Sequence, residues 1–134
     1  MPFPGDALPV KIALIAGGGA IGCTLRYGTS HYCGRLFGDG FPWGTLAVNL
    51  FGCLIIGLLY EMSCRSVYFG PGAKLFFITG FLGGLTTFST YALENANALS
   101  EGSWMLTCLN IVGSNALGVA LVFIGMRMAR TLVA

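Results

Sequence analysis

The chain has 134 residues, of which 55% are hydrophobic and only 9% are charged. This balance excludes an ordinary soluble domain and predicts a protein of the lipid bilayer. Seven basic and five acidic residues give a formal net charge of +2, too little for the basic surface with which proteins bind nucleic acid, so we expect no nucleic-acid partner.

Long uncharged stretches indicate the membrane segments. Residues 40–60, 75–93 and 102–126 contain no Asp, Glu, Lys or Arg, and each is long enough to cross a hydrocarbon core about 30 Å thick. A first segment is interrupted by Arg26, whose long side chain we expect to reach one membrane interface. The sequence therefore predicts an all-α membrane protein with a single domain, residues 1–134, and spans at about residues 10–34, 40–62, 74–98 and 103–128.

Basic residues are shared unequally between the two ends of such a four-helix chain. The end with both termini would carry Lys11, Arg65, Lys74, Arg127 and Arg130, and the other end Arg26 and Arg35. Because cytoplasmic loops are enriched in Lys and Arg, this excess favours a cytoplasmic location for both termini. A chain with so few loop charges can also insert in both orientations.

Several polar residues lie inside the apolar stretches, where an unsatisfied amide or hydroxyl group costs several kcal/mol. Asn49 falls near the middle of the second span, and its ordinary role is an interhelical hydrogen bond. One face of the fourth span carries Asn110, Ser114 and Gly118, which recur every four residues. This face predicts close helix packing, alone or together with a functional role, and Gly18 and Gly22 predict a similar contact on the first span.

The third span contains GFLGGLTTFSTYALEN, residues 80–95, whose glycine and hydroxyl residues weaken a helix. We expect a break near Thr86 and Thr87, with a threonine capping the helix that restarts. A break frees main-chain carbonyl and amide groups, which become ion ligands where they face protein or a cavity. Beyond it, Phe88 and Tyr91 share a face; core packing is the ordinary explanation, but ring edges are also positively polarised.

Carboxylates, which most cation-coupled transporters require, are absent from the middle of the predicted spans, and Glu94 lies at the end of the third. The remaining groups are an amide, hydroxyls, ring edges and helix N-terminal amides, all donors that suit an anion. His31 has no carboxylate or cysteine arrangement around it, and the five cysteines form no CxxC pair, so we expect neither an enzyme nor a cysteine metal site.

Four blocks cover almost the whole chain: GGGAIGCTLRY (17–27), GTLAVNLFG (44–52), GFLGGLTTFSTY (80–91) and NIVGSNALG (110–118). In this order they resemble the CrcB family, the Fluc fluoride channels. The combination of GxTTFSTY in one span with GTLxVNxxG in the preceding span makes the resemblance specific.

The resemblance implies an antiparallel, dual-topology homodimer in a bacterial inner membrane. Such a dimer exports fluoride passively from the cytoplasm, rejecting chloride, through two pathways formed between the subunits. The pore residues implied are Asn49, Phe88, Ser89, Thr90, Tyr91 and Ser114. The asparagine would offer its amide, the aromatic residues their ring edges, and the other three their hydroxyl groups.

The resemblance also implies a structural sodium ion at the dimer centre. Main-chain carbonyls of Gly83 and Thr86 would hold it, and a two-fold interface would duplicate each ligand. Arg26 matches the family arginine of the first block, and Glu94 would lie toward a pore mouth.

Two positions depart from the family pattern. Tyr91 stands where phenylalanine is usual, so its hydroxyl either bonds outward or alters a fluoride station. Gly118 stands where some members have serine, which shortens the polar path.

Two other classes stay open from the residues. A small multidrug-resistance-type, proton-coupled exporter should carry a membrane-centred glutamate in its first span, where this chain has Arg26. A purely structural assembly protein would use its polar residues only to join helices, and Asn49→Asp or Phe88→Ile would then alter no fluoride flux.

Overall fold

The computed structural model describes residues 7–65 and 69–132, so the predicted single domain over residues 1–134 includes positions outside the described ranges. Four segments are long and apolar enough to cross a membrane: α1 (Leu8–Phe37), α2 (Trp43–Arg65), a composite third segment (Pro71–Ser100) and α6 (Trp104–Leu132). The described residues contain no strand. The structure thus confirms the predicted all-α class with four spanning helices.

The third segment is built from four pieces. It begins with α3 (Pro71–Ala73) and the π-helical stretch η1 (Lys74–Leu82), and continues through α4 (Gly83–Leu85) to α5 (Phe88–Ser100). Between α4 and α5 the chain is extended, with ψ of 154° at Thr86 and φ of −149° at Thr87. The predicted break in the third helix is therefore confirmed, and it lies at these two threonines.

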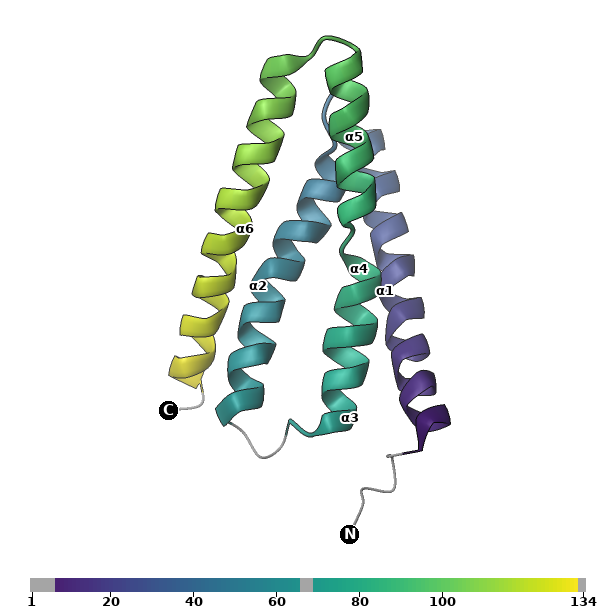
Figure 1. The fold of residues 1–134 in the computed structure, drawn as a ribbon, viewed down its shortest axis with the longest axis vertical. Coiled ribbons are helices and arrows are strands. Elements are labelled where there is room, and N and C mark those ends of the chain that lie inside the picture. Colours follow the sequence, from purple (N-terminus) through teal and green to yellow (C-terminus); the bar gives the residue numbers. More distant parts are fainter. Residues whose placement is uncertain (1–6, 66–68, 133–134) are drawn as a thin grey trace.

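The closest helix contacts occur at glycines, where the main chains of two helices touch. In Figure 1, α6 runs beside α2, and α1 runs behind η1 and α4. A Cβ atom at Gly18 would collide with the main-chain oxygen of Phe76, and one at Gly22 with that of Phe81. The predicted close contact at these two glycines is confirmed, and its partner is the third segment.

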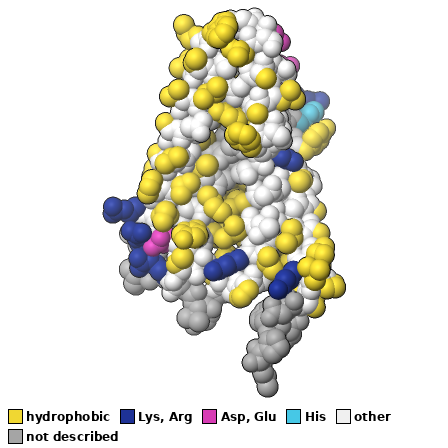
Figure 2. Space-filling view, in the orientation of Figure 1, with side chains coloured by type: hydrophobic (Ala, Val, Ile, Leu, Met, Phe, Trp, Pro, Cys, Tyr) yellow, Lys and Arg dark blue, Asp and Glu magenta, His cyan; other side chains and the backbone are white. Residues whose placement is uncertain are grey.

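A small buried cluster lies just before the break. Val48, Leu82 and Leu85 are each at most 4% exposed and pack together where α2 meets the third segment. Most other large apolar side chains face outward, as Figure 2 shows for one face, and in a spanning protein these surfaces meet lipid or another chain. The cluster fixes the height of the break relative to α2.

Candidate functional site

Thr87 caps the helix that restarts after the break. Its Oγ1 accepts a hydrogen bond from the Thr90 main-chain N–H at 3.2 Å and donates one to Thr90 Oγ1 at 3.0 Å. Ser89 Oγ lies 3.4 Å from the same hydroxyl oxygen. Because the cap satisfies an amide that has lost its helical partner, the predicted capping threonine is confirmed as Thr87.

Asn49 on α2 holds the other side of the break. Its Oδ1 accepts from the Thr87 main-chain N–H at 2.8 Å, and its Nδ2 donates to the Thr87 carbonyl oxygen at 3.0 Å. The amide thus replaces the helical partner that the Thr87 N–H has lost, and it adds a second donor to the carbonyl of this N-cap residue, which also accepts the first hydrogen bond of α5. One of the two Nδ2 hydrogens is not used in this pair.

These contacts release two main-chain carbonyls from helical bonding. In an unbroken helix the Gly83 carbonyl would accept from Thr87 N–H and the Thr86 carbonyl from Thr90 N–H. Here Asn49 takes the first amide and the Thr87 hydroxyl takes the second. The freed oxygens belong to the two residues for which the family resemblance implies sodium coordination.

Arg26 lies beside the break, where it contacts one of these oxygens. Its Nη1 is 3.5 Å from the Thr86 carbonyl oxygen, although the sequence predicts this side chain at a membrane interface. That expectation was wrong because α1 packs main chain against main chain on the third segment at Gly22, one turn earlier. Carbonyl oxygens have two lone pairs, so the Thr86 oxygen keeps one lone pair beside this contact.

A cavity of about 410 Å³ opens at the break. Asn49, Gly83, Thr86, Thr87 and Phe88 line it, together with apolar residues of α2 and η1. The structure therefore brings the predicted pore amide, one predicted pore ring and both predicted sodium ligands to one cavity.

A second cavity of about 410 Å³ lies at the end of the bundle where α1 ends and α2 begins, and Thr90 and Glu94 line it. Thr45 Oγ1 donates to Glu94 Oε1 at 2.6 Å, while Glu94 Oε2 is buried with no partner in the described structure. Since Thr87 contacts both Asn49 and Thr90, a hydrogen-bonded path joins the two cavities.

The two predicted pore aromatics lie next to each other on α5. Their ring centroids are 5.8 Å apart with an interplanar angle of 41°, and Phe88 is 79% exposed in the single chain. Tyr91 Oη accepts a hydrogen bond from Asn115 Nδ2 on α6 at 3.2 Å. The tyrosine hydroxyl is thus tied to α6, away from the cavity at the break.

Ser114 belongs to a polar chain between α5 and α6. Its hydroxyl donates to Asn110 Oδ1 at 3.0 Å, Asn110 Nδ2 donates to Asn95 Oδ1 at 3.1 Å, and Asn95 Nδ2 donates to the Tyr91 carbonyl at 2.8 Å. Both asparagines are buried. This network links Ser114 to the main chain of Tyr91, and Ser114 does not line the cavity at the break.

Three residues of this site were not predicted from the sequence: Thr45, Asn95 and Asn115. Asn95 carried a usable signal, since it stands four residues after Tyr91 and is thus on the same helical face. The partner of Thr45 was not visible, because Glu94 lies 49 residues away in the sequence.

Four apolar spanning helices, with a polar break inside the third, define a multi-pass membrane protein. The family model described as "CrcB-like protein, Camphor Resistance (CrcB)" matches residues 13–126. The chain belongs to the CrcB family, as its sequence blocks predicted.

Curated relatives match over nearly their whole length. "Fluoride-specific ion channel FluC" of Agrobacterium fabrum is 42% identical over 123 residues, which is 92% of this chain and 98% of the relative. Proteins of the same name from Maridesulfovibrio salexigens and Citrifermentans bemidjiense are 41% and 42% identical, with 98% and 97% of their lengths covered and 92% of this chain.

Proposed function

We propose that this protein is a fluoride-selective channel through which fluoride leaves the cytoplasm passively, which lowers its toxicity. The relatives are named for this ion, and their class is that of a channel, not an enzyme. The observation that carries the proposal is the hydrogen-bonded line from Asn49 through Thr87 to Thr90, which connects the cavity at the break with the cavity at the bundle end.

The chemistry along this line suits a small anion. Fluoride is strongly hydrated, so its shell must be replaced by several close donors. Asn49 keeps one amide hydrogen, and Phe88 presents its ring beside that amide in the same cavity. A narrow path lined by such donors discriminates against larger halides because they cannot approach all donors at once.

A second copy of the chain is needed to close the route. The cavity at the break opens on the flank of the protomer, and Phe88 is mostly exposed there, where lipid cannot solvate an ion. We therefore propose an antiparallel homodimer across this flank. The freed carbonyls of Gly83 and Thr86, doubled by two-fold symmetry, would hold a sodium ion whose charge offsets that of a passing anion.

An antiparallel homodimer requires that this chain insert in both orientations. With Arg26 placed at the break, Arg35 is the basic residue left at the end where α1 finishes, against five at the other end. This imbalance favours one orientation. Reporter fusions at the C-terminus in a bacterial inner membrane measure the ratio; detection of one orientation alone would rule out an antiparallel homodimer of this chain.

Purified protein in liposomes provides the direct test. Fluoride should leave loaded vesicles down its own gradient without a pH gradient, and chloride should stay. Asn49→Asp should abolish the flux, because a carboxylate repels the anion while keeping an acceptor for Thr87 N–H. Chloride efflux at a comparable rate would contradict the selectivity.

The family membership does not support the proton-coupled exporter considered as an alternative. The same vesicles test it, because flux that stops when the pH gradient is removed would favour the exporter. Growth rescue of fluoride-sensitive cells by the wild-type chain, and loss of that rescue with Asn49→Asp, would show the activity in a membrane.

A further inference from the structure

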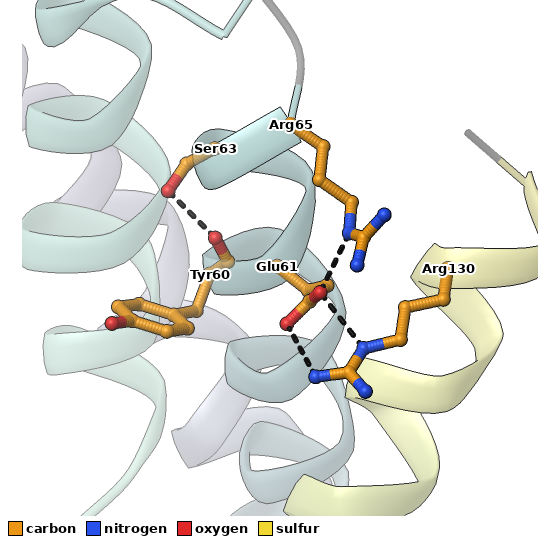
Figure 3. A network of polar contacts seen from close by, with 5 residues as sticks. All are labelled: Tyr60, Glu61, Ser63, Arg65 and Arg130. Carbon is orange, nitrogen blue, oxygen red and sulfur yellow. Dashed lines mark hydrogen bonds and ion pairs between the residues drawn. The ribbon is translucent and has the colours of Figure 1, made fainter. Parts of the chain in front are cut away.

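Two arginines share one buried carboxylate at the end of the bundle where α2 ends. Glu61 Oε1 accepts from Arg65 Nε at 2.7 Å and from Arg130 Nε at 2.8 Å, and Glu61 Oε2 lies 3.5 Å from Arg130 Nη2. Figure 3 shows both guanidinium groups turned toward the carboxylate. The Glu61 side chain is 8% exposed, whereas those of the arginines are 46% and 47% exposed.

The close packing of α2 against α6 determines where the Glu61 carboxylate lies. A Cβ atom at Gly57 would collide with the Val122 carbonyl oxygen on α6, and one at Gly125 with the Leu54 carbonyl oxygen on α2. Glu61 follows Gly57 by one helical turn, so its carboxylate is enclosed between the two main chains. Arg65 reaches the carboxylate from α2 itself, and Arg130 reaches it from α6.

The cluster keeps unused donors and a net positive charge. Two guanidinium groups face one carboxylate, and each guanidinium carries five N–H donors. Neither Nη atom of Arg65 bonds any described residue, and neither does Nη1 of Arg130. Because Glu61 restrains both side chains, less rotamer entropy is lost when these donors bind an anion.

The surroundings are those of a membrane interface. The cluster stands at the ends of two spanning helices. Exposed Phe123 and Val119 lie on the same face of α6 as Arg130, toward the middle of the span. Figure 2 shows Lys and Arg gathered at this end of the molecule beside the apolar surface. A ligand bound at this site would contact the arginines at the helix ends and, next to them, an apolar surface of α6.

We propose that Arg65 and Arg130, restrained by Glu61, form a binding site for the phosphate of an anionic phospholipid, with the acyl chains along α6. Guanidinium forks match phosphate oxygens, and the adjoining apolar surface favours a lipid over a soluble anion. The proposal does not depend on fluoride conduction.

The test uses the full chain in detergent micelles and measures bound lipid by native mass spectrometry. Phosphatidylglycerol should bind more tightly than phosphatidylcholine of the same acyl chains. Arg65→Gln should weaken phosphatidylglycerol binding about tenfold or more, as expected for lost charge-assisted hydrogen bonds. Lys74→Gln, which removes one positive charge at the same end outside the cluster, should weaken it about fivefold at most.

The Arg65→Lys variant distinguishes the planar donor geometry of the guanidinium group from its positive charge. It keeps the charge but loses the planar donors, so binding should still weaken several-fold. The proposal fails if Arg65→Lys binds like wild type, if Lys74→Gln weakens binding as much as Arg65→Gln, or if both lipids bind equally. It also fails if millimolar inorganic phosphate displaces phosphatidylglycerol, because the site would then serve a soluble anion.

Discussion

Removal of the Asn49 amide should destabilise the protein by leaving a buried main-chain N–H group without a partner. Asn49→Ala leaves the Thr87 N–H without the partner that now lies at 2.8 Å, and Thr87 is only 7% exposed. The Thr87 carbonyl loses the amide at 3.0 Å but, as the N-cap of α5, keeps the first hydrogen bond of that helix. Each buried main-chain group left unpaired costs about 1–3 kcal/mol. One such group is left unpaired, so the expected loss in the free energy of unfolding is about 1–3 kcal/mol.

Asn97→Ala is the matched control. Asn97 lies on α5 in the wall of the end cavity, and its side chain makes no hydrogen bond with the described residues. The same atoms are removed, but no main-chain partner is lost. We expect this variant to stay within about 0.5 kcal/mol of wild type.

Equilibrium denaturation of the full chain in micelles, at one fixed protein concentration, measures both variants. A free-energy loss for Asn49→Ala below about 1 kcal/mol, or one equal to that of Asn97→Ala, would refute the view that this amide holds the break. In liposomes Asn49→Ala should also lose fluoride efflux, because the extended segment would no longer be fixed.

Three further substitutions test separate parts of the structure. Gly22→Val should prevent folding, because its side chain would collide with the main chain of the third segment, whereas Gly28→Ala, with open space around it, should fold normally. Thermal melting compares the two variants, and equal melting temperatures would contradict the contact at Gly22. Phe88→Ile should abolish fluoride efflux from liposomes. Because the ring is mostly exposed, the free energy of unfolding should change by no more than about 0.5 kcal/mol. Unaltered efflux would contradict the assignment of this ring to the pore. Tyr91→Phe should cost about 0.5–1.5 kcal/mol by denaturation, from the lost hydrogen bond of Asn115, with efflux retained; loss of efflux would mean that the hydroxyl contacts the ion.

The four spans and the position of the break are local properties, and the sequence was sufficient to predict them. An apolar stretch in lipid satisfies its main chain as a helix, so composition alone indicated the segments. The glycines and threonines of residues 80–91 weaken that helix wherever it packs. The predicted capping threonine followed from the same local chemistry.

The polar contacts between distant segments were decided by the tertiary structure. Asn49 and Thr87 are 38 residues apart, Arg26 and Thr86 are 60 apart, and Glu61 and Arg130 are 69 apart. These contacts depend on which helices pack together and on how far each is shifted along its axis. Main-chain contacts at glycines such as Gly22 determine both. A single sequence shows that such glycines exist but not which helix they face, and for this reason Arg26 was predicted at an interface but lies at the break.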